Sequence, residues 1–143
     1  MKILLAVDGS ESAVRATRKL VETLAWYKQT PQIELVTVQS LVPHVVPFAR
    51  VVISQDMVER YYREEAEKAL APSKQVLDAA GIRYNPHVLV GEIAQTIVEH
   101  AQKSGCEVIY MGTRGMSAIS SALLGSITIK VVHLARVPVV LVQ

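Results

Sequence analysis

The stretch KILLAVDGS, residues 2–10, joins a short apolar run to a polar turn. The run Lys2–Val7 is almost wholly apolar, which is typical of a strand buried on both faces of a parallel sheet. An Asp-Gly pair ends the run, and Ser10 is the predicted N-cap of a helix over Glu11–Tyr27. In that helix, apolar residues recur along one face at spacings of three and four. The stretch therefore predicts a buried strand, a turn and an amphipathic helix in succession.

The same alternation continues along the rest of the chain. Residues 40–54 contain two prolines and are predicted as a long loop. Five strands joined by four helices call for one parallel sheet with right-handed crossovers and helices on both faces. We therefore expect an α/β fold in which residues 1–143 form one domain. The further strands are predicted at Ile33–Gln39, Tyr84–Val90, Val108–Met111 and Val137–Val142, and the further helices at Gln55–Ala80, Glu92–Lys103 and Ser126–Ala135.

One of these helices contains a proline. Pro72 lies well inside the segment predicted as helical over Gln55–Ala80. Because proline has no amide hydrogen to donate, we expect Pro72 to kink or to interrupt this helix. Gly81, directly after the segment, is a natural C-terminal stop.

Composition and charge exclude several classes of function. The chain is half apolar and one-fifth charged, so it can bury a real core. Its net charge of +2 is too small, and its basic residues too scattered, for a nucleic-acid surface. No apolar run approaches the roughly 18 residues that span a bilayer, and Asp8 ends the apolar start before it reaches signal-peptide length. We expect a cytoplasmic protein that binds neither nucleic acid nor membranes.

The sequence predicts no metal site. Cys106 is the single cysteine, which excludes an intrachain disulfide and a thiolate cluster, and we expect it to be a small buried residue. No metal-ligand spacing is formed by the four histidines, His44, His87, His100 and His133.

Candidate binding segments follow the first and fourth predicted strands. They are the turn after Val7, the glycine-rich segment GTRG at residues 112–115, and Gly125-Ser126 at the start of the last helix. Ligands of such sheets bind beyond the carboxyl ends of the strands, where the strand order reverses. Glycines let backbone amides approach an anion, and a helix N-terminus offers unpaired amides to it. Ser126 and Thr128 add hydroxyl donors, and Arg114 is a candidate partner for phosphate.

These segments also have structural explanations, because glycines and Asp-Gly pairs shape turns and hydroxyl side chains cap helices. The familiar nucleotide motifs are missing. The sequence has no G-x-x-x-x-G-K-[ST] motif, and no G-x-G-x-x-G follows the first strand. A receiver domain needs an acceptor aspartate after the third strand, where this chain has Val90-Gly91.

Three longer stretches carry a family resemblance. They are ILLAVDGS at residues 3–10, GEIAQTIVEHA at 91–101 and MGTRGMSAISSALLGS at 111–126. With them, and with the closing VPVVLV, the chain resembles the universal stress protein family over essentially its full length. The spacing Gly112-x2-Gly115-x9-Gly125-Ser126 fits the G-2x-G-9x-G-[ST] pattern of the ATP-binding branch of that family.

The resemblance implies a role for each part of the site. Asp8 contacts the ribose or adenine side of the nucleotide, Val38 lines the adenine pocket, and the amino end of the last helix holds the phosphates. Arg114 lies at a loop position that varies in the family. The implied nucleotide contacts are Ala6, Val7, Asp8, Val38, Met111, Gly112, Arg114, Gly115, Gly125, Ser126, Ile127 and Thr128.

The resemblance also implies a ligand and a partner. The ligand is ATP, with any Mg²⁺ or Mn²⁺ held mainly by its phosphates, and the partner is a second copy bound through Val137–Val142. Pairing of that strand agrees with the general liability of an apolar sheet edge. The expected function is regulatory: nucleotide occupancy orders residues 113–124 and changes a surface read by an unknown protein partner.

Two alternative functions stay open at this point. The first is a slow ATP hydrolase, and the second is an interaction module that binds AMP, another adenine nucleotide or no ligand. Against the hydrolase, the sequence offers no Walker-type lysine and no general base beside the expected phosphates. Asp8 is the one carboxylate at the expected site, on its nucleoside side. We therefore expect hydrolysis to be slow or absent.

Overall fold

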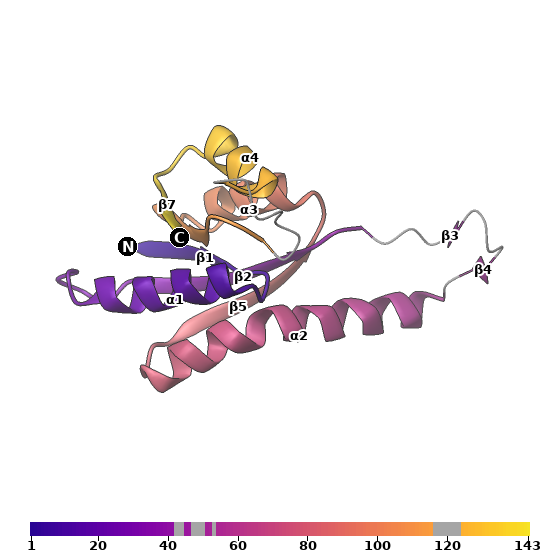
Figure 1. The fold of residues 1–143 in the computed structure, drawn as a ribbon, viewed down its shortest axis with the longest axis horizontal. Coiled ribbons are helices and arrows are strands. Elements are labelled where there is room, and N and C mark those ends of the chain that lie inside the picture. The colour runs from indigo at the N-terminus through magenta and orange to yellow at the C-terminus, as the bar shows by residue number, and fades with distance from the viewer. Residues whose placement is uncertain (42–44, 47–50, 53, 116–123) are drawn as a thin grey trace.

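The computed structural model describes residues 1–41, 45–46, 51–52, 54–115 and 124–143. Its main sheet has five parallel strands in the order β5-β2-β1-β6-β7, with helices on both faces, as the sequence predicts (Figure 1). The elements are β1 Lys2–Ala6, α1 Glu11–Leu24, β2 Gln32–Gln39, β3 Val45–Val46, β4 Val51–Val52, α2 Gln55–Ala79, β5 Tyr84–Val90, α3 Ile93–Lys103, β6 Val108–Gly112, α4 Ser126–Leu134 and β7 Val139–Val142.

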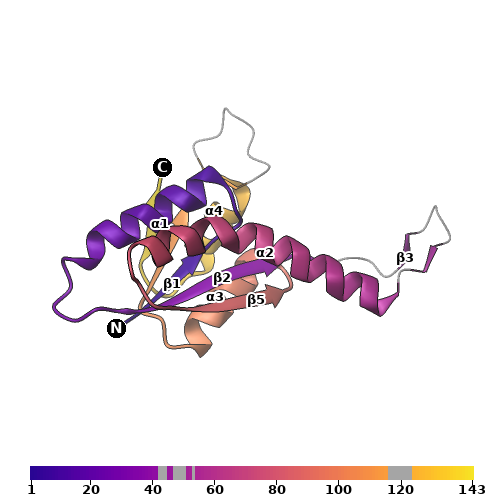
Figure 2. The same cartoon turned by 90° about the horizontal axis from the view of Figure 1, so that it is seen from below.

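Alternate residues of β1 build two separate cores. Ile3 and Leu5 pack with Leu20 on the face covered by α1 and α2. Leu4 and Ala6 pack on the opposite face, which α3 and α4 cover (Figures 1 and 2). Burial on both sides explains why this strand is apolar at every position after Lys2 rather than at every second one.

The order of the strands reverses between β1 and β6. From β1 the chain crosses to β2 and then β5 on one side, whereas β6 leads to β7 on the other. The two strands pair in parallel, with Ala6 opposite Met111 near their carboxyl ends. The crevice outside these ends is the position at which open α/β sheets bind their ligands.

Pro72 does not interrupt α2, which runs unbroken from Gln55 to Ala79. Its missing amide leaves the carbonyl of Lys68, four residues earlier, without a helical donor. Gly9 lies against this part of α2: a Cβ on Gly9 would be 3.2 Å from the Lys68 oxygen and 3.1 Å from Ala69 Cα. The φ of Gly9 is also +83°, a region that disfavours side chains. The turn after β1 therefore packs against α2 where the helix lacks a hydrogen bond.

Other differences from the sequence prediction are local. Within the predicted loop 40–54, β3 and β4 pair antiparallel and lie beyond the N-terminal end of α2, away from the main sheet (Figure 1). The first helix ends at Leu24 because the chain tightens there, with Trp26 N donating to Thr23 O at 3.0 Å. The last strand begins after Pro138, which has no amide hydrogen to donate.

Among the helices of the described residues, none has the length and apolarity needed to span a bilayer.

Candidate functional site

A pocket of about 90 Å³ lies at the carboxyl ends of β1 and β6. Its walls include Val36 of β2, Ile93 and Ile97 of α3, and Ala13 of α1, none of which sequence analysis assigned to the site. Ten of the twelve predicted contacts line it: Ala6, Val7, Asp8, Val38, Met111, Gly112, Arg114, Gly115, Ile127 and Thr128. The turn after β1, the end of β6 and the start of α4 therefore converge on one pocket.

The two remaining predicted residues, Gly125 and Ser126, do not line the pocket but lie at the amino end of α4. Gly125 is the N-cap, so no side chain caps the first turn of this helix. Its own amide donates to Thr113 O at 2.7 Å, which holds the helix start beside the end of β6. Because the first amides of a helix have no partner within it, this end is suited to an anion. Ile127 and Thr128 of the same turn bring it to the pocket wall.

The hydroxyl of Thr128 has a structural task. It is buried and donates to two backbone carbonyl oxygens, Gly112 O at 3.3 Å and Thr113 O at 3.2 Å. These bonds tie the first turn of α4 to the end of β6. Thr128 thus positions the helix start, whereas sequence analysis gave its hydroxyl to phosphate.

Two serines at the start of α1 hold the segment after β6. Ser10 Oγ accepts from Ala13 N at 3.2 Å, which confirms it as the N-cap, and donates to Arg114 O at 3.5 Å. Ser12 Oγ accepts from Arg114 N at 3.4 Å and donates to Val142 O at 3.5 Å. Arg114 is thereby fixed through its backbone, and its exposed side chain lies at the pocket.

The three glycines of the sequence pattern differ in their surroundings. A Cβ on Gly112 would lie 2.4 Å from Ser12 Oγ and 2.7 Å from the Ser12 carbonyl carbon, so β6 and α1 meet there without room for a side chain. A Cβ on Gly115 would lie 2.9 Å from Asp8 Oδ2. Gly125 has ordinary space, with the nearest atom at 3.5 Å. Gly112 is therefore required by packing, and Gly125 is not.

Asp8 lies at the pocket in a defined orientation. Its Oδ1 accepts from Ser10 N at 3.0 Å, which fixes the carboxylate above the start of α1. A second hollow, of about 360 Å³, shares Asp8 and extends to Glu65 and Lys68 of α2. The hydrogen bond from Lys68 Nζ to Glu65 Oε1, at 2.7 Å, raises the pKa of Lys68 above its usual value. The two hollows together present the carboxylates of Asp8 and Glu65, the cationic side chains of Lys68 and Arg114, and an apolar wall.

Comparison with known proteins agrees with this arrangement. The family model described as the universal stress protein family matches residues 1–143. The chain belongs to the universal stress protein family. It is 32% identical over 142 residues to a universal stress protein of Thermus aquaticus, covering 99% of this chain and 97% of that protein. It is 28% identical to universal stress protein YxiE of Bacillus subtilis, covering 99% and 98% of the two chains.

Solved structures of other universal stress proteins share the fold. UspA of Lactobacillus plantarum superposes with a TM-score of 0.82 at 19% identity, covering 100% of this chain and 97% of the other. An Archaeoglobus fulgidus protein in complex with dAMP gives 0.65 at 23% identity, with 100% and 98% covered. An Arabidopsis thaliana protein with AMP bound gives 0.65 at 16% identity, with 99% and 90% covered.

The pocket residues that sequence analysis missed in this universal stress protein carry no polar signal. Ile93 and Ile97 belong to the apolar stripe of α3, and Ala13 to the corresponding stripe of α1. The chain order alone could have placed Ile93 at the site, because α3 begins directly after β5 and its first turn therefore lies at the carboxyl ends of the strands.

Residues 116–123, within the predicted 113–124 loop, lie outside the described residues.

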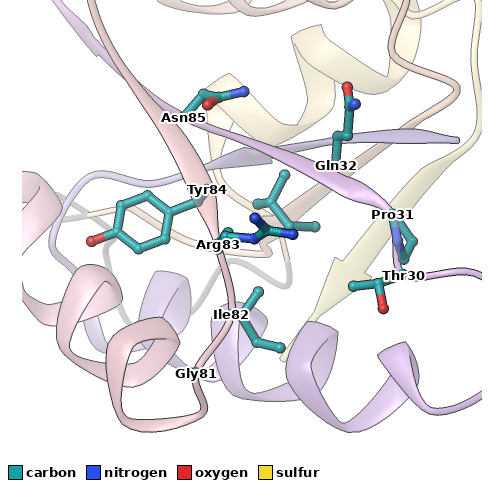
Figure 3. A pocket seen from close by; sticks show the side chains of 9 residues that line it. Thr30, Pro31, Gln32, Gly81, Ile82, Arg83, Tyr84 and Asn85 are labelled. Carbon is teal, nitrogen blue, oxygen red and sulfur yellow. The ribbon is translucent and has the colours of Figure 1, made fainter.

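A larger cavity of about 690 Å³ lies elsewhere in this universal stress protein. It is bordered by the segments 30–33 and 81–85, at the amino ends of β2 and β5, and Figure 3 shows Arg83 lying among its lining residues. Ligands of α/β folds bind at the carboxyl ends of the strands, whereas this cavity lies at the amino ends. Its size alone therefore does not make it the nucleotide site.

The single cysteine is buried, as the sequence predicts. Burial raises the pKa of the Cys106 thiol, and the Glu34 carboxylate adds to this effect. A thiol with a raised pKa forms little thiolate at neutral pH and is a poor nucleophile.

Proposed function

We propose that this universal stress protein binds an adenine nucleotide, with ATP as the first candidate, in the pocket at the carboxyl ends of β1 and β6 and acts as a nucleotide-dependent regulator. The observation that carries the proposal is the convergence of ten predicted contacts on one pocket at the reversal of strand order. The names of two structural neighbours, which specify dAMP and AMP, support the choice of an adenine nucleotide.

The residues present suit the parts of a nucleotide. Val38, Ile93 and Ile97 form an apolar wall of the kind that a purine ring contacts. The Asp8 carboxylate is an acceptor for ribose hydroxyls, and the amino end of α4 is a donor site for phosphate. A divalent cation would be held mainly by the phosphates themselves, since Asp8 is the one carboxylate among the described pocket residues.

The size of the pocket indicates a partly exposed ligand. Small-molecule pockets usually enclose about 300–1,000 Å³, whereas this one holds about 90 Å³. The neighbouring hollow of about 360 Å³ shares Asp8 and offers further room. A nucleotide would bury its base against the apolar wall and leave much of its remaining surface in contact with water.

We expect Gly125→Val to lower the affinity for ATP and AMP at least about tenfold, because a branched side chain would cover the amides at the start of α4. The space around Gly125 and its φ of −71° permit the substitution in the fold. Nucleotide released from the denatured protein is identified by chromatography, and the affinities of nucleotide-free protein are measured by titration calorimetry. Circular dichroism verifies that the variant is folded.

Arg83→Ala, in the larger cavity, is the matched control for the location of binding. We expect it to change the affinity less than about twofold. If neither ATP nor AMP binds the wild-type protein, the proposal fails and a nucleotide-independent interaction module remains. A loss of binding in Arg83→Ala but not in Gly125→Val would transfer the site to the amino ends of the strands.

We also propose that two copies associate through β7. This strand is at the edge of the main sheet: one side pairs with β6, and the other side is the free edge of that sheet. Beside it, Ile129 and Val132 of α4 are 55% and 48% exposed, an apolar surface suited to a partner. Light scattering should give twice the chain mass of 15.7 kDa. Leu141→Pro, which removes a backbone donor on the side of β7 that faces away from β6, should shift the mass toward one chain, and a monomeric wild-type protein would refute the pairing.

A further inference from the structure

Three potential metal ligands meet on the α3 side of the sheet, away from the nucleotide pocket. They are Glu34 of β2, His87 of β5 and His100 of α3, and their ligand atoms all lie within 4.8 Å of one another. The parallel register explains the meeting, because Glu34 is opposite Asn85 and side chains two residues apart share a face of the sheet. His87 thus follows Asn85 on the face that α3 covers. The spacing along the sequence gives no sign of this arrangement.

Glu34 is an unusual residue for this position. It is 4% exposed in the middle of a buried strand, although a buried carboxylate is costly unless it is paired. Its Oε1 is held by Asn85 Nδ2 at 3.3 Å and lies 3.7 Å from Lys2 Nζ. Its Oε2 lies 2.5 Å from His87 Nε2. One oxygen is therefore oriented by protein groups, and the other faces an imidazole.

The two imidazoles lie close together beside this carboxylate. The ring centroids of His87 and His100 are 4.6 Å apart, with planes inclined at 55°. Ser104 Oγ lies 3.2 Å from His100 Nε2 and gives that ring a neighbour of its own. Asn85 beside Glu34 and Ser104 beside His100 are polar neighbours of the kind that orient the ligands of metal sites.

We propose that Glu34, His87 and His100 bind a divalent transition-metal ion, with Zn²⁺ as the cation that best suits two imidazoles and one carboxylate. Zinc sites with His₂Glu ligands keep a fourth position for water. Ligand atoms about 2.0–2.1 Å from a tetrahedral ion are about 3.3 Å apart. From their present separations, the three side chains would adjust by no more than about 1.5 Å. The ion would join the edge strand β5 to its neighbour β2 and to α3.

The proposal is tested with untagged protein that has been freed of metal by chelation. Co²⁺, which replaces Zn²⁺ and absorbs visible light when bound in such sites, should titrate one ion per chain. We expect Zn²⁺ to displace the Co²⁺ and to raise the melting temperature. His87→Ala and His100→Ala should each weaken binding by about 100-fold or more, since loss of an outer partner alone costs 10–100-fold.

His133→Ala is the matched control, because His133 is an exposed histidine of α4 outside the cluster. It should leave the Co²⁺ spectrum and the affinity unchanged. Glu34→Gln, which keeps the shape of the side chain, provides a third test if either histidine variant fails to fold. Absence of saturable Co²⁺ and Zn²⁺ binding would overturn the proposal and leave the cluster as hydrogen-bonded side chains. Binding retained in both histidine variants would place the ion elsewhere and overturn the proposal.

Discussion

Gly112→Ala is expected to lower the free energy of unfolding by about 3 kcal/mol, at the upper end of the usual cost of overpacking. The added methyl group would overlap both the side chain and the backbone of Ser12, so α1 has to move away from β6. The movement also disturbs the hydrogen bonds that Ser12 makes with Arg114 and Val142. Chemical denaturation of the nucleotide-free protein measures the effect without any contribution from ligand binding.

Gly125→Ala is the control for this prediction. It adds the same methyl group to the same glycine pattern, but the nearest atom is 3.5 Å away. Its cost should stay near that of losing a glycine N-cap, below about 1 kcal/mol. Equal stability of the Gly112→Ala and wild-type proteins would contradict the prediction, because α1 and β6 would then be able to make room for the added methyl group.

Asp8→Ala is expected to weaken adenine nucleotide binding by about 10–100-fold, the usual value of a hydrogen bond to a charged group. The carboxylate is held at the pocket by Ser10 N, so it can accept from ribose hydroxyls without a large rearrangement. Asp8→Asn keeps an acceptor for Ser10 N and should lose less affinity. Titration calorimetry with AMP and ATP measures both variants.

Glu11→Ala is the control for Asp8→Ala, because each substitution removes one negative charge. The Glu11 side chain is 96% exposed at the start of α1, outside the lining of the pocket. Its loss should change nucleotide affinity less than about twofold, because long-range effects between exposed charges are screened by salt. If Asp8→Ala binds as tightly as wild type, or if Glu11→Ala loses as much affinity, the carboxylate of Asp8 does not contact the ribose.

The sequence was sufficient to predict the main sheet and its helices. Tyr84–Val90 is a strand over the predicted residues, and the burial of Ile3, Leu4 and Leu5 matches their unbroken apolar run. The sequence left open an interruption of the helix at Pro72, and none occurs. The residue that lies beside the freed Lys68 carbonyl is Gly9, which is 63 positions from Pro72 in the sequence and comes close only through the tertiary fold.

In the candidate site, too, some residues are predictable from the sequence and others are not. Residues that follow strands, such as Asp8 and Gly115, are identifiable because turn chemistry is a local property of the sequence. Ile93 and Ile97 are indistinguishable from core residues until the position of α3 over the sheet is known. The meeting of Glu34 with His87 depends on the pairing register of two strands, to which the intervening residues give no clue.

The contact between Gly9 and α2 gives the long helix the geometry of a lever. Its pivot is the backbone near Lys68, which packs against Gly9, and Gly9 directly follows Asp8, whose carboxylate is expected to touch the ligand. From Lys68 to Gln55 the helix extends about 20 Å at a rise of 1.5 Å per residue. A tilt of about 5° at the pivot would therefore displace the far end by about 2 Å. A change at the Asp8 turn too small to alter the sheet would be magnified at the N-terminal end of α2.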